Sequence, residues 1–155
     1  LKIIAGGGSA GGHISLLATT NPGLNDPSDT KKYDTTVAAY LLFNPALSAT
    51  DAKDPQVDFL QHLKDDLPPA IVFFGSEDTW LKKGWKTASA KMSSLKISDS
   101  IEVRIANGQG HGFFNRQPWT DVTLIEADRF LKALGYLEGN PTLIMPKTGE
   151  KLERG

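Results

Sequence analysis

Four runs of apolar residues, each followed by a segment of helical character, constrain the fold of this chain more than any other feature. The runs cover residues 1–5, 37–45, 70–78 (where the last four form a turn) and 101–107. The second and third are apolar without alternation, which is typical of strands buried on both faces. Strands of this kind alternate with helices in parallel sheets. We therefore expect an α/β fold with a mostly parallel sheet and helices on both faces.

The segments between the runs predict the helices. Residues 80–96 carry apolar side chains at helical spacing, and a helix that starts near Pro118 ends at Gly135. Shorter helices are expected at 13–18 and 57–64, and residues 19–36 read as a long polar loop. The tail, residues 138–155, is polar apart from the patch Thr-Leu-Ile-Met, which we expect to lie against the body of the protein.

The composition excludes several classes of protein. A length of 155 residues suits one domain, and a net charge of −1 with interspersed acids and bases offers no basic surface for nucleic acid. No apolar run reaches the length of a membrane span, so we expect none. Cysteine is absent, so neither disulfides nor thiolate chemistry are expected, and the composition favours no particular compartment.

The glycine cluster "KIIAGGGSAGGH", residues 2–13, fits two motifs. Gly6, Gly8 and Gly11 match G-x-G-x-x-G, the turn that places a dinucleotide pyrophosphate on a helix N-terminus. Gly7, Ser9 and Gly11 match G-x-S-x-G, the sharp turn that presents a nucleophilic serine. Both motifs require a strand before the turn and a helix after it, so the decision rests on residues further along the chain.

The dinucleotide motif lacks its partner acid. It requires a second strand that ends in Asp or Glu about 20 residues on, where the carboxylate holds the ribose. Asp26 and Asp29 lie near that distance but inside a Pro/Gly/Asn loop, and the second strand ends in Asn44-Pro45. No Gly-Lys-Ser/Thr follows the cluster either, which excludes a phosphate-binding P-loop there. A dinucleotide-binding module remains the alternative from another class.

The serine motif finds both of its partners in the required order. Asp78 comes four residues after Phe74, where the third strand finishes, and His111 lies in a glycine-flanked loop just past the fourth strand. The active sites of open parallel sheets assemble at the carboxyl ends of their strands. A serine hydroxyl needs a base that takes its proton, and that base needs a carboxylate that orients it. We therefore adopt the serine interpretation.

Four segments, "GGGSAGGH", "LLFNP", "PPAIVFFGSED" and "GQGHGFFN", closely resemble the α/β-hydrolase family, over roughly residues 2–135. Within it they resemble carboxylesterases and lipases of the hormone-sensitive-lipase and acetyl-xylan-esterase type. The resemblance implies Ser9 as nucleophile, His111 as general base and acid, and Asp78 as the residue that orients the imidazole. It also implies that the backbone N–H of Ala10 belongs to the oxyanion hole, and that no cofactor is needed.

The resemblance further implies hydrolysis of carboxylic esters with short acyl groups, acetyl among them, with a small-molecule ester as substrate. Serine peptidases of the prolyl-oligopeptidase type share the order of the three residues and are the alternative within the fold. A catalytically silent scaffold is a third possibility.

The chain begins within a strand and lacks the upstream His-Gly-Gly loop with which family members complete the oxyanion hole. We therefore expect residues 1–137 to be the C-terminal portion of a catalytic domain, completed by an N-terminal segment of the same protein, and 138–155 to be its tail.

The remaining candidate residues have simpler interpretations. His13 reads as a packing or hydrogen-bonding residue behind the turn, and His62 as a surface residue. Trp85 is expected to pack between helix and sheet, whereas Phe113 and Phe114 are expected to wall the site. Glu77 adjoins Asp78 but lies off the family position. The three histidines are not spaced with carboxylates as metal ligands, so a catalytic metal is not expected.

Overall fold

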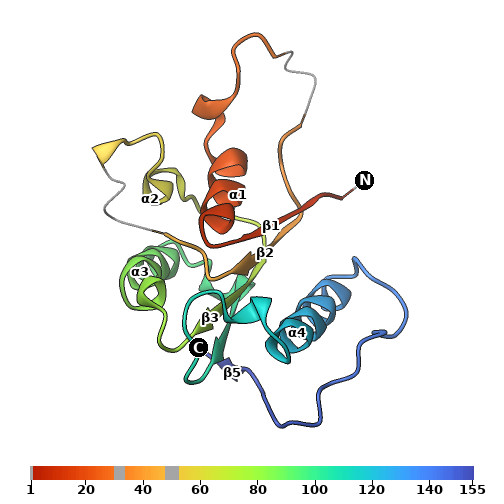
Figure 1. The fold of residues 1–155 in the computed structure, drawn as a ribbon. Coiled ribbons are helices and arrows are strands. Elements are labelled where there is room, and N and C mark those ends of the chain that lie inside the picture. The colour runs from red at the N-terminus through yellow and green to blue at the C-terminus, as the bar shows by residue number, and fades with distance from the viewer. Residues whose placement is uncertain (1, 30–33, 48–52) are drawn as a thin grey trace.

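A computed structural model describes residues 2–29, 34–47 and 53–155, and its centre is a five-stranded sheet (Figure 1). The strands follow one another in chain order across the sheet, and the first four are parallel. They are β1 Ile4–Gly8, β2 Ala39–Phe43, β3 Ala70–Gly75, β4 Ile101–Ala106 and the antiparallel β5 Glu153–Arg154. The carboxyl ends of β1 to β4 therefore lie along one edge of the sheet.

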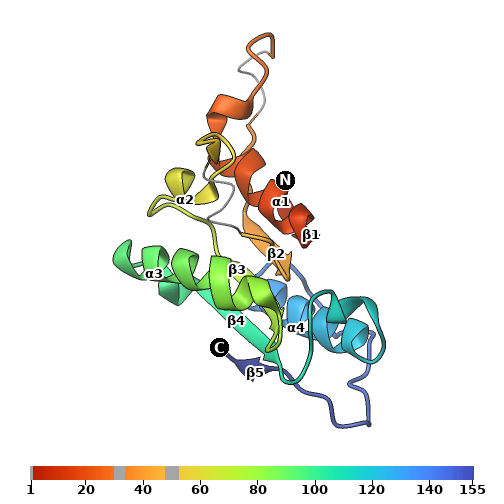
Figure 2. The same cartoon turned by 60° about the vertical axis from the view of Figure 1, so that its left-hand side comes forward.

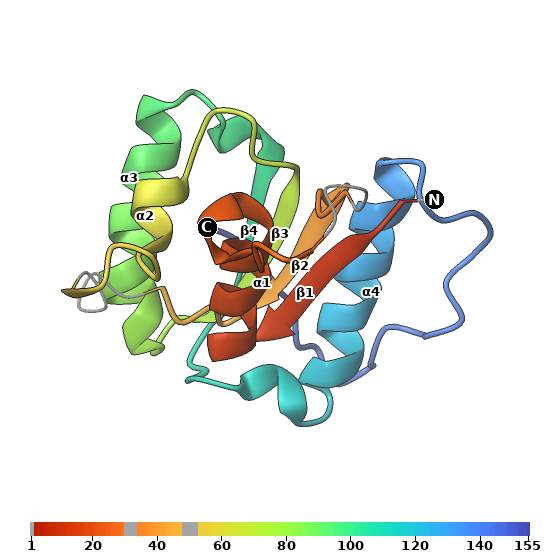
Figure 3. The ribbon, with the colours of Figure 1, turned by 90° about the horizontal axis from the view of Figure 1, so that it is seen from above.

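Helices cover the sheet on both faces, which confirms the predicted fold class (Figures 2 and 3). They are α1 Ala10–Thr20, α2 Phe59–His62, α3 Lys86–Ser94 and α4 Trp119–Ala133. The first three share an apolar cluster with one face of β2 and β3, and α4 shares a second cluster with the other face. All six residues of β3 are buried, because this strand lies in the middle of the sheet and is covered on both sides. Trp85 packs on Phe74 with ring centroids 5.6 Å apart, as expected.

The first strand differs from the expectation. The sequence predicts residues 1–5, but β1 runs from Ile4 through the glycines to Gly8. Gly6, Gly7 and Gly8 pair in register with residues 41–43 of β2, so tertiary pairing extends the strand through residues with low strand propensity. The turn is shortened as a result, and α1 begins at Ala10, directly after Ser9.

Two further segments depart from the prediction. The helix expected over 80–96 begins with a π-helical turn, Leu81–Trp85, before α3. The tail contributes β5, which pairs with β4, whereas its apolar patch is exposed: Ile144 is 83% accessible. Leu152, not the patch, packs against the core. Among residues 2–29, 34–47 and 53–155, no helix combines the length and the apolar character that a membrane crossing requires.

Candidate active site

Ser9 occupies a sharp turn between β1 and α1. Its backbone has φ 55° and ψ −121°, a positive φ that is uncommon for a residue with a side chain. Two hydrogen bonds to the segment at the end of β2 hold it there. The N–H of Ser9 donates to the carbonyl oxygen of Phe43 (2.9 Å), and the N–H of Ala46 donates to the carbonyl oxygen of Ser9 (3.0 Å). The surrounding structure thus fixes a strained backbone at the proposed nucleophile.

The two motif glycines around Ser9 differ in what surrounds them. A Cβ on Gly7 would lie 2.6 Å from the carbonyl carbon of Gly11, so the strand and the first turn of α1 meet there backbone to backbone. A Cβ on Gly11 would meet none of the described residues within 4 Å. Gly7 is therefore required by the close approach of β1 and α1, and Gly11 is not.

We expect Gly7→Ala to lower the free energy of unfolding by about 2 kcal/mol, because the methyl group forces the strand and helix apart. Gly11→Ala is the matched control in the same turn. It should leave stability unchanged or raise it by up to about 1 kcal/mol, because alanine is the better helix former. Urea unfolding of both variants beside the wild type measures the difference. Equal losses in the two variants would contradict this account of the turn.

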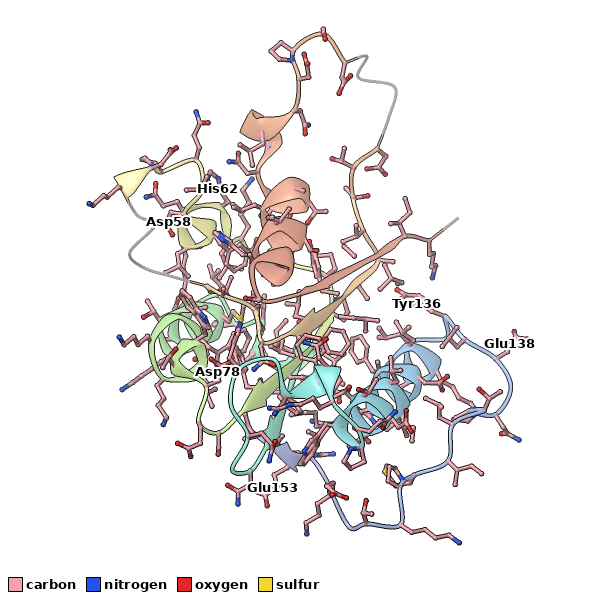
Figure 4. The ribbon with its side chains drawn as sticks, viewed as in Figure 1. Asp58, His62, Asp78, Tyr136, Glu138 and Glu153 are labelled. Atoms are coloured by element: carbon pink, nitrogen blue, oxygen red, sulfur yellow. The ribbon has the colours of Figure 1, made fainter. Side chains whose placement is uncertain are left out.

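Asp78 lies three residues beyond the end of β3 and is buried. Its side chain is 0% accessible, and Figure 4 shows it in the interior of the molecule, in contrast to Glu138 and Glu153 at the periphery. One carboxylate oxygen, Oδ1, accepts a hydrogen bond from the N–H of Trp80 (2.9 Å). The other, Oδ2, accepts from His111 and from Asn44. These donors compensate the cost of burying the carboxylate.

His111 joins Asp78 to Ser9. Its Nδ1 lies 3.0 Å from Oδ2 of Asp78, and its Nε2 lies 2.8 Å from Oγ of Ser9. A carboxylate can only accept, so the ring proton belongs on Nδ1, which leaves the lone pair of Nε2 for the serine hydroxyl. The side chain of His111 is 39% accessible, so the end of this chain of hydrogen bonds faces solvent. The structure brings together the three side chains that the sequence singled out.

The loops that carry Asp78 and His111 are bonded to each other. The N–H of Glu77 donates to the carbonyl oxygen of Gln109 (2.9 Å), and the N–H of Gly108 donates to Oγ of Ser76 (2.9 Å). A Cβ on Gly75 would lie 2.1 Å from that same Gln109 oxygen. The acid and the histidine are thus mounted on two loops in direct backbone contact.

Asn44 is the residue at the site that the sequence reasoning did not assign. It follows β2 directly, is 0% accessible, and its Nδ2 donates to Oδ2 of Asp78. Its signal in the sequence is an asparagine at the carboxyl end of a buried strand, a pattern that by itself indicates only where the strand ends. Ala10, expected to supply an oxyanion donor, is the exposed first residue of α1, where backbone N–H groups have no partner within the helix.

Other candidate residues lie outside this set of contacts. His13 Nε2 contacts the carbonyl oxygen of Val57 and His62 Nε2 that of Pro55, both at 2.9 Å. Phe113 is completely buried, whereas Phe114 is half-buried and its ring lies against Gly8, beside Ser9. The carboxylate of Glu77 is exposed and pairs with Lys82.

The described part of the chain can also be compared with a dinucleotide site and with a metal site. Asp26 and Asp29 are exposed in the loop after α1 and do not follow a strand. Ser28 donates hydrogen bonds to Asp26 from its hydroxyl and its N–H, which lowers the pKa of that carboxyl. Over residues 2–29, 34–47 and 53–155, no three His, Asp or Glu side chains form a cluster that could hold a metal ion.

Neither protein-family models nor curated protein sequences match this chain. Solved structures do match, and several are of esterase 2 from the planctomycete Thermogutta terrifontis. Its paraoxon-phosphorylated form is 30% identical with a TM-score of 0.75, over 89% of this chain and 56% of the esterase. Its propionate-bound form is 28% identical with a TM-score of 0.73, over 90% and 58%. Its native form is 27% identical with a TM-score of 0.72, over 96% and 57%.

The matches extend over nearly all of this chain but little more than half of the esterase. They agree with the observed architecture, a mostly parallel sheet covered by helices on both faces. The described residues therefore have an α/β-hydrolase fold, and the chain is similar to an esterase with that fold over somewhat more than half of the esterase's length.

Proposed function

We propose that this chain carries the reacting residues of a carboxylic ester hydrolase, with Ser9 as nucleophile. One observation carries the proposal: the imidazole of His111 contacts the hydroxyl of Ser9 on one side and the buried carboxylate of Asp78 on the other. This arrangement can take a proton from an alcohol and stabilise the resulting cation, which is what acyl transfer to serine requires. The similarity to an esterase that paraoxon phosphorylates supports the same chemistry.

The contacts define the role of each residue in the reaction. As Oγ of Ser9 attacks the ester carbonyl, its proton passes to Nε2 of His111, and Asp78 stabilises the imidazolium through Nδ1–H. The imidazolium then protonates the leaving alcohol, and an acyl group remains on Ser9. Water that gives a proton to His111 attacks this acyl-enzyme, and the imidazolium returns that proton to Oγ of Ser9 as the carboxylic acid leaves. The N–H of Ala10, at the N-terminus of α1, is the proposed donor to the oxyanion in both steps.

We further propose that another segment of the same protein completes the catalytic domain, of which residues 1–137 form the C-terminal portion and 138–155 the tail. Among the described residues β1 pairs only with β2, so its other edge has unpaired backbone groups that a further strand could satisfy. The chain spans 56–59% of the length of the matched esterase, which agrees with a part of a larger domain. This segment would also bring the second oxyanion donor.

Short-chain esters, acetyl esters among them, are the proposed substrates. The matched esterase has been solved with propionate and with butyrate bound, both small acyl products. The half-buried ring of Phe114 beside Ser9 provides an apolar wall for such a group. Within the fold we place the chain with hydrolases of the hormone-sensitive-lipase or acetyl-xylan-esterase type, on the sequence resemblance.

Labelling with a fluorophosphonate tests the proposal, because the probe forms a covalent bond only with an activated serine. We expect one adduct per chain in the complete protein, located on Ser9 by peptide mass spectrometry, and none in Ser9→Ala. Ser15→Ala is the matched control, since Ser15 lies in α1 and donates to backbone oxygens of Gly6 and Gly11. It should label like the wild type. An adduct on another serine, or none in the wild type, would overturn the assignment.

A further inference from the structure

Asn44 is held in place at the end of β2 by its backbone. Its φ of 49° lies in the left-handed region, which asparagine adopts more readily than most residues with a side chain. Its N–H donates to the carbonyl oxygen of Phe73 on β3 (2.7 Å), and the residue is completely buried. The amide is therefore presented to the neighbouring strand end, where Asp78 lies.

The side chain of Asn44 acts on the carboxylate oxygen that holds His111. Its Nδ2 donates to Oδ2 of Asp78, which also accepts from Nδ1 of His111 at 3.0 Å. The other carboxylate oxygen is fixed by the N–H of Trp80 (2.9 Å). Asn44 and Trp80 thus give each oxygen a donor besides the imidazole, so the carboxyl group cannot rotate away from His111.

The amide of Asn44 is only half satisfied. Among the described residues its Oδ1 is buried without a hydrogen-bond partner. A buried acceptor without a partner costs free energy, and a glycine would occupy the same backbone conformation without that cost. Packing and backbone geometry therefore do not account for this side chain, whereas its N–H bond to Asp78 does.

We propose that Asn44 is a positioning residue that locks the carboxylate of Asp78 toward His111. The proposal rests on the proposed function, since the orientation of the imidazole matters only if His111 takes the proton of Ser9. Asn44 does not touch the reacting atoms, so it acts through Asp78 and His111. Its removal lets the carboxyl group turn, and fewer molecules then have Nε2 aimed at the hydroxyl.

Two variants separate this role from a structural one. Asn44→Gly keeps the left-handed backbone and removes the amide. Asn44→Asp keeps the size and shape but replaces the amide donor with a group that donates only when protonated. In the described structure the one titratable side chain bonded to Asp78 is His111, from the loop after β4, since the exposed carboxylate of Glu77 pairs with Lys82. The introduced acid would therefore interact mainly with Asp78.

The pH response of Asn44→Asp has a definite sign. Two adjacent carboxyls raise the pKa of one of them, so at low pH the introduced acid is neutral and its O–H replaces the lost donor. As pH rises the introduced acid ionises and its carboxylate repels that of Asp78, so the bond is lost. The ratio of variant to wild-type labelling rates should therefore fall as pH rises through the pKa of the introduced acid.

The experiment measures the second-order rate of fluorophosphonate labelling of Ser9 in the complete protein, with circular dichroism at each pH. We expect Asn44→Gly to label about 10-fold more slowly or worse while it stays folded, and Asn44→Asp to show the falling ratio. Wild-type rates in both variants would overturn the role of Asn44 and leave the proposed function intact. The role of Asn44 would also be overturned if the ratio of labelling rates for Asn44→Asp did not change with pH and the slower labelling of the variants paralleled a loss of folded structure. Absence of labelling in the wild type would overturn the proposed function itself.

Discussion

Replacing His111 with alanine should slow ester hydrolysis by about 10⁶-fold in kcat, a loss on the scale of removing the base from other serine hydrolases. The reason is local, because Nε2 of His111 is the basic atom 2.8 Å from Oγ of Ser9 and Asp78 has no direct contact with that hydroxyl in the described structure. Without the imidazole the serine keeps its proton. Initial rates with a short-chain ester of a chromogenic phenol measure the loss.

His62→Ala is the matched control for this substitution. His62 ends α2, and its ring bonds the carbonyl oxygen of Pro55 and none of Ser9, Asp78 and His111 in the described structure. Its removal should leave kcat within about two-fold of the wild type, since the half-buried His62 takes no part in the contacts of Ser9, Asp78 and His111. A loss of comparable size in both variants would place the base elsewhere, and an unimpaired His111→Ala would rule out the proposed mechanism.

Gly75→Ala is expected to damage stability and activity together. Its methyl group would lie 2.1 Å from the carbonyl oxygen of Gln109, and backbone on both sides leaves no flexible side chain to move aside. We expect a loss of about 3 kcal/mol or more, which corresponds to a Tm lower by about 10 °C. Activity should fall in protein that remains folded, because separating the two loops separates Asp78 from His111.

Gly110→Ala, in the same loop, tests whether the collision is the cause. A Cβ at position 110 would meet none of the described residues within 4 Å, and its φ is not positive. We therefore expect a Tm within about 2 °C of the wild type. Thermal unfolding and ester hydrolysis are measured on all three proteins. If Gly75→Ala has the same Tm as Gly110→Ala and hydrolyses the ester at the wild-type rate, the contact between the loops is not what holds the acid and the histidine together.

The chain positions of Ser9, Asp78 and His111 could be predicted because each follows an apolar run that ends in a turn. In a parallel sheet, the order of the runs and their carboxyl ends are enough to place such residues on one edge. That the three side chains bond to one another required coordinates, and their catalytic roles stay a prediction. The fold class could be predicted from even less of the sequence. The unbroken apolar runs of β2 and β3 require both faces of these strands to be buried, and few arrangements other than a parallel sheet covered by helices do this.

The remaining features depend on contacts between distant segments. Asn44 reaches Asp78 only because β2 and β3 are neighbours, with Phe43, the last residue of β2, opposite Phe73. The order of the strands in the sheet could not be predicted from the sequence. The glycines of β1 read as a turn until β2 pairs with them. The strand β5 consists of two exposed charged residues, Glu153 and Arg154, so no apolar pattern announces it. Local patterns carry no information on such pairings.

The site draws one polar residue from the end of each of four adjacent strands, and each is bonded to a residue from another strand end. If any one of these strands slipped by a single residue, its polar residue would move about 3.3 Å along the sheet. This displacement is larger than the length of a hydrogen bond, so the bond would be lost. The chemical reactivity of a single hydroxyl therefore reports whether the four parallel strands have assembled in their native alignment. Covalent probes of Ser9 could follow refolding as sensitively as they follow hydrolysis.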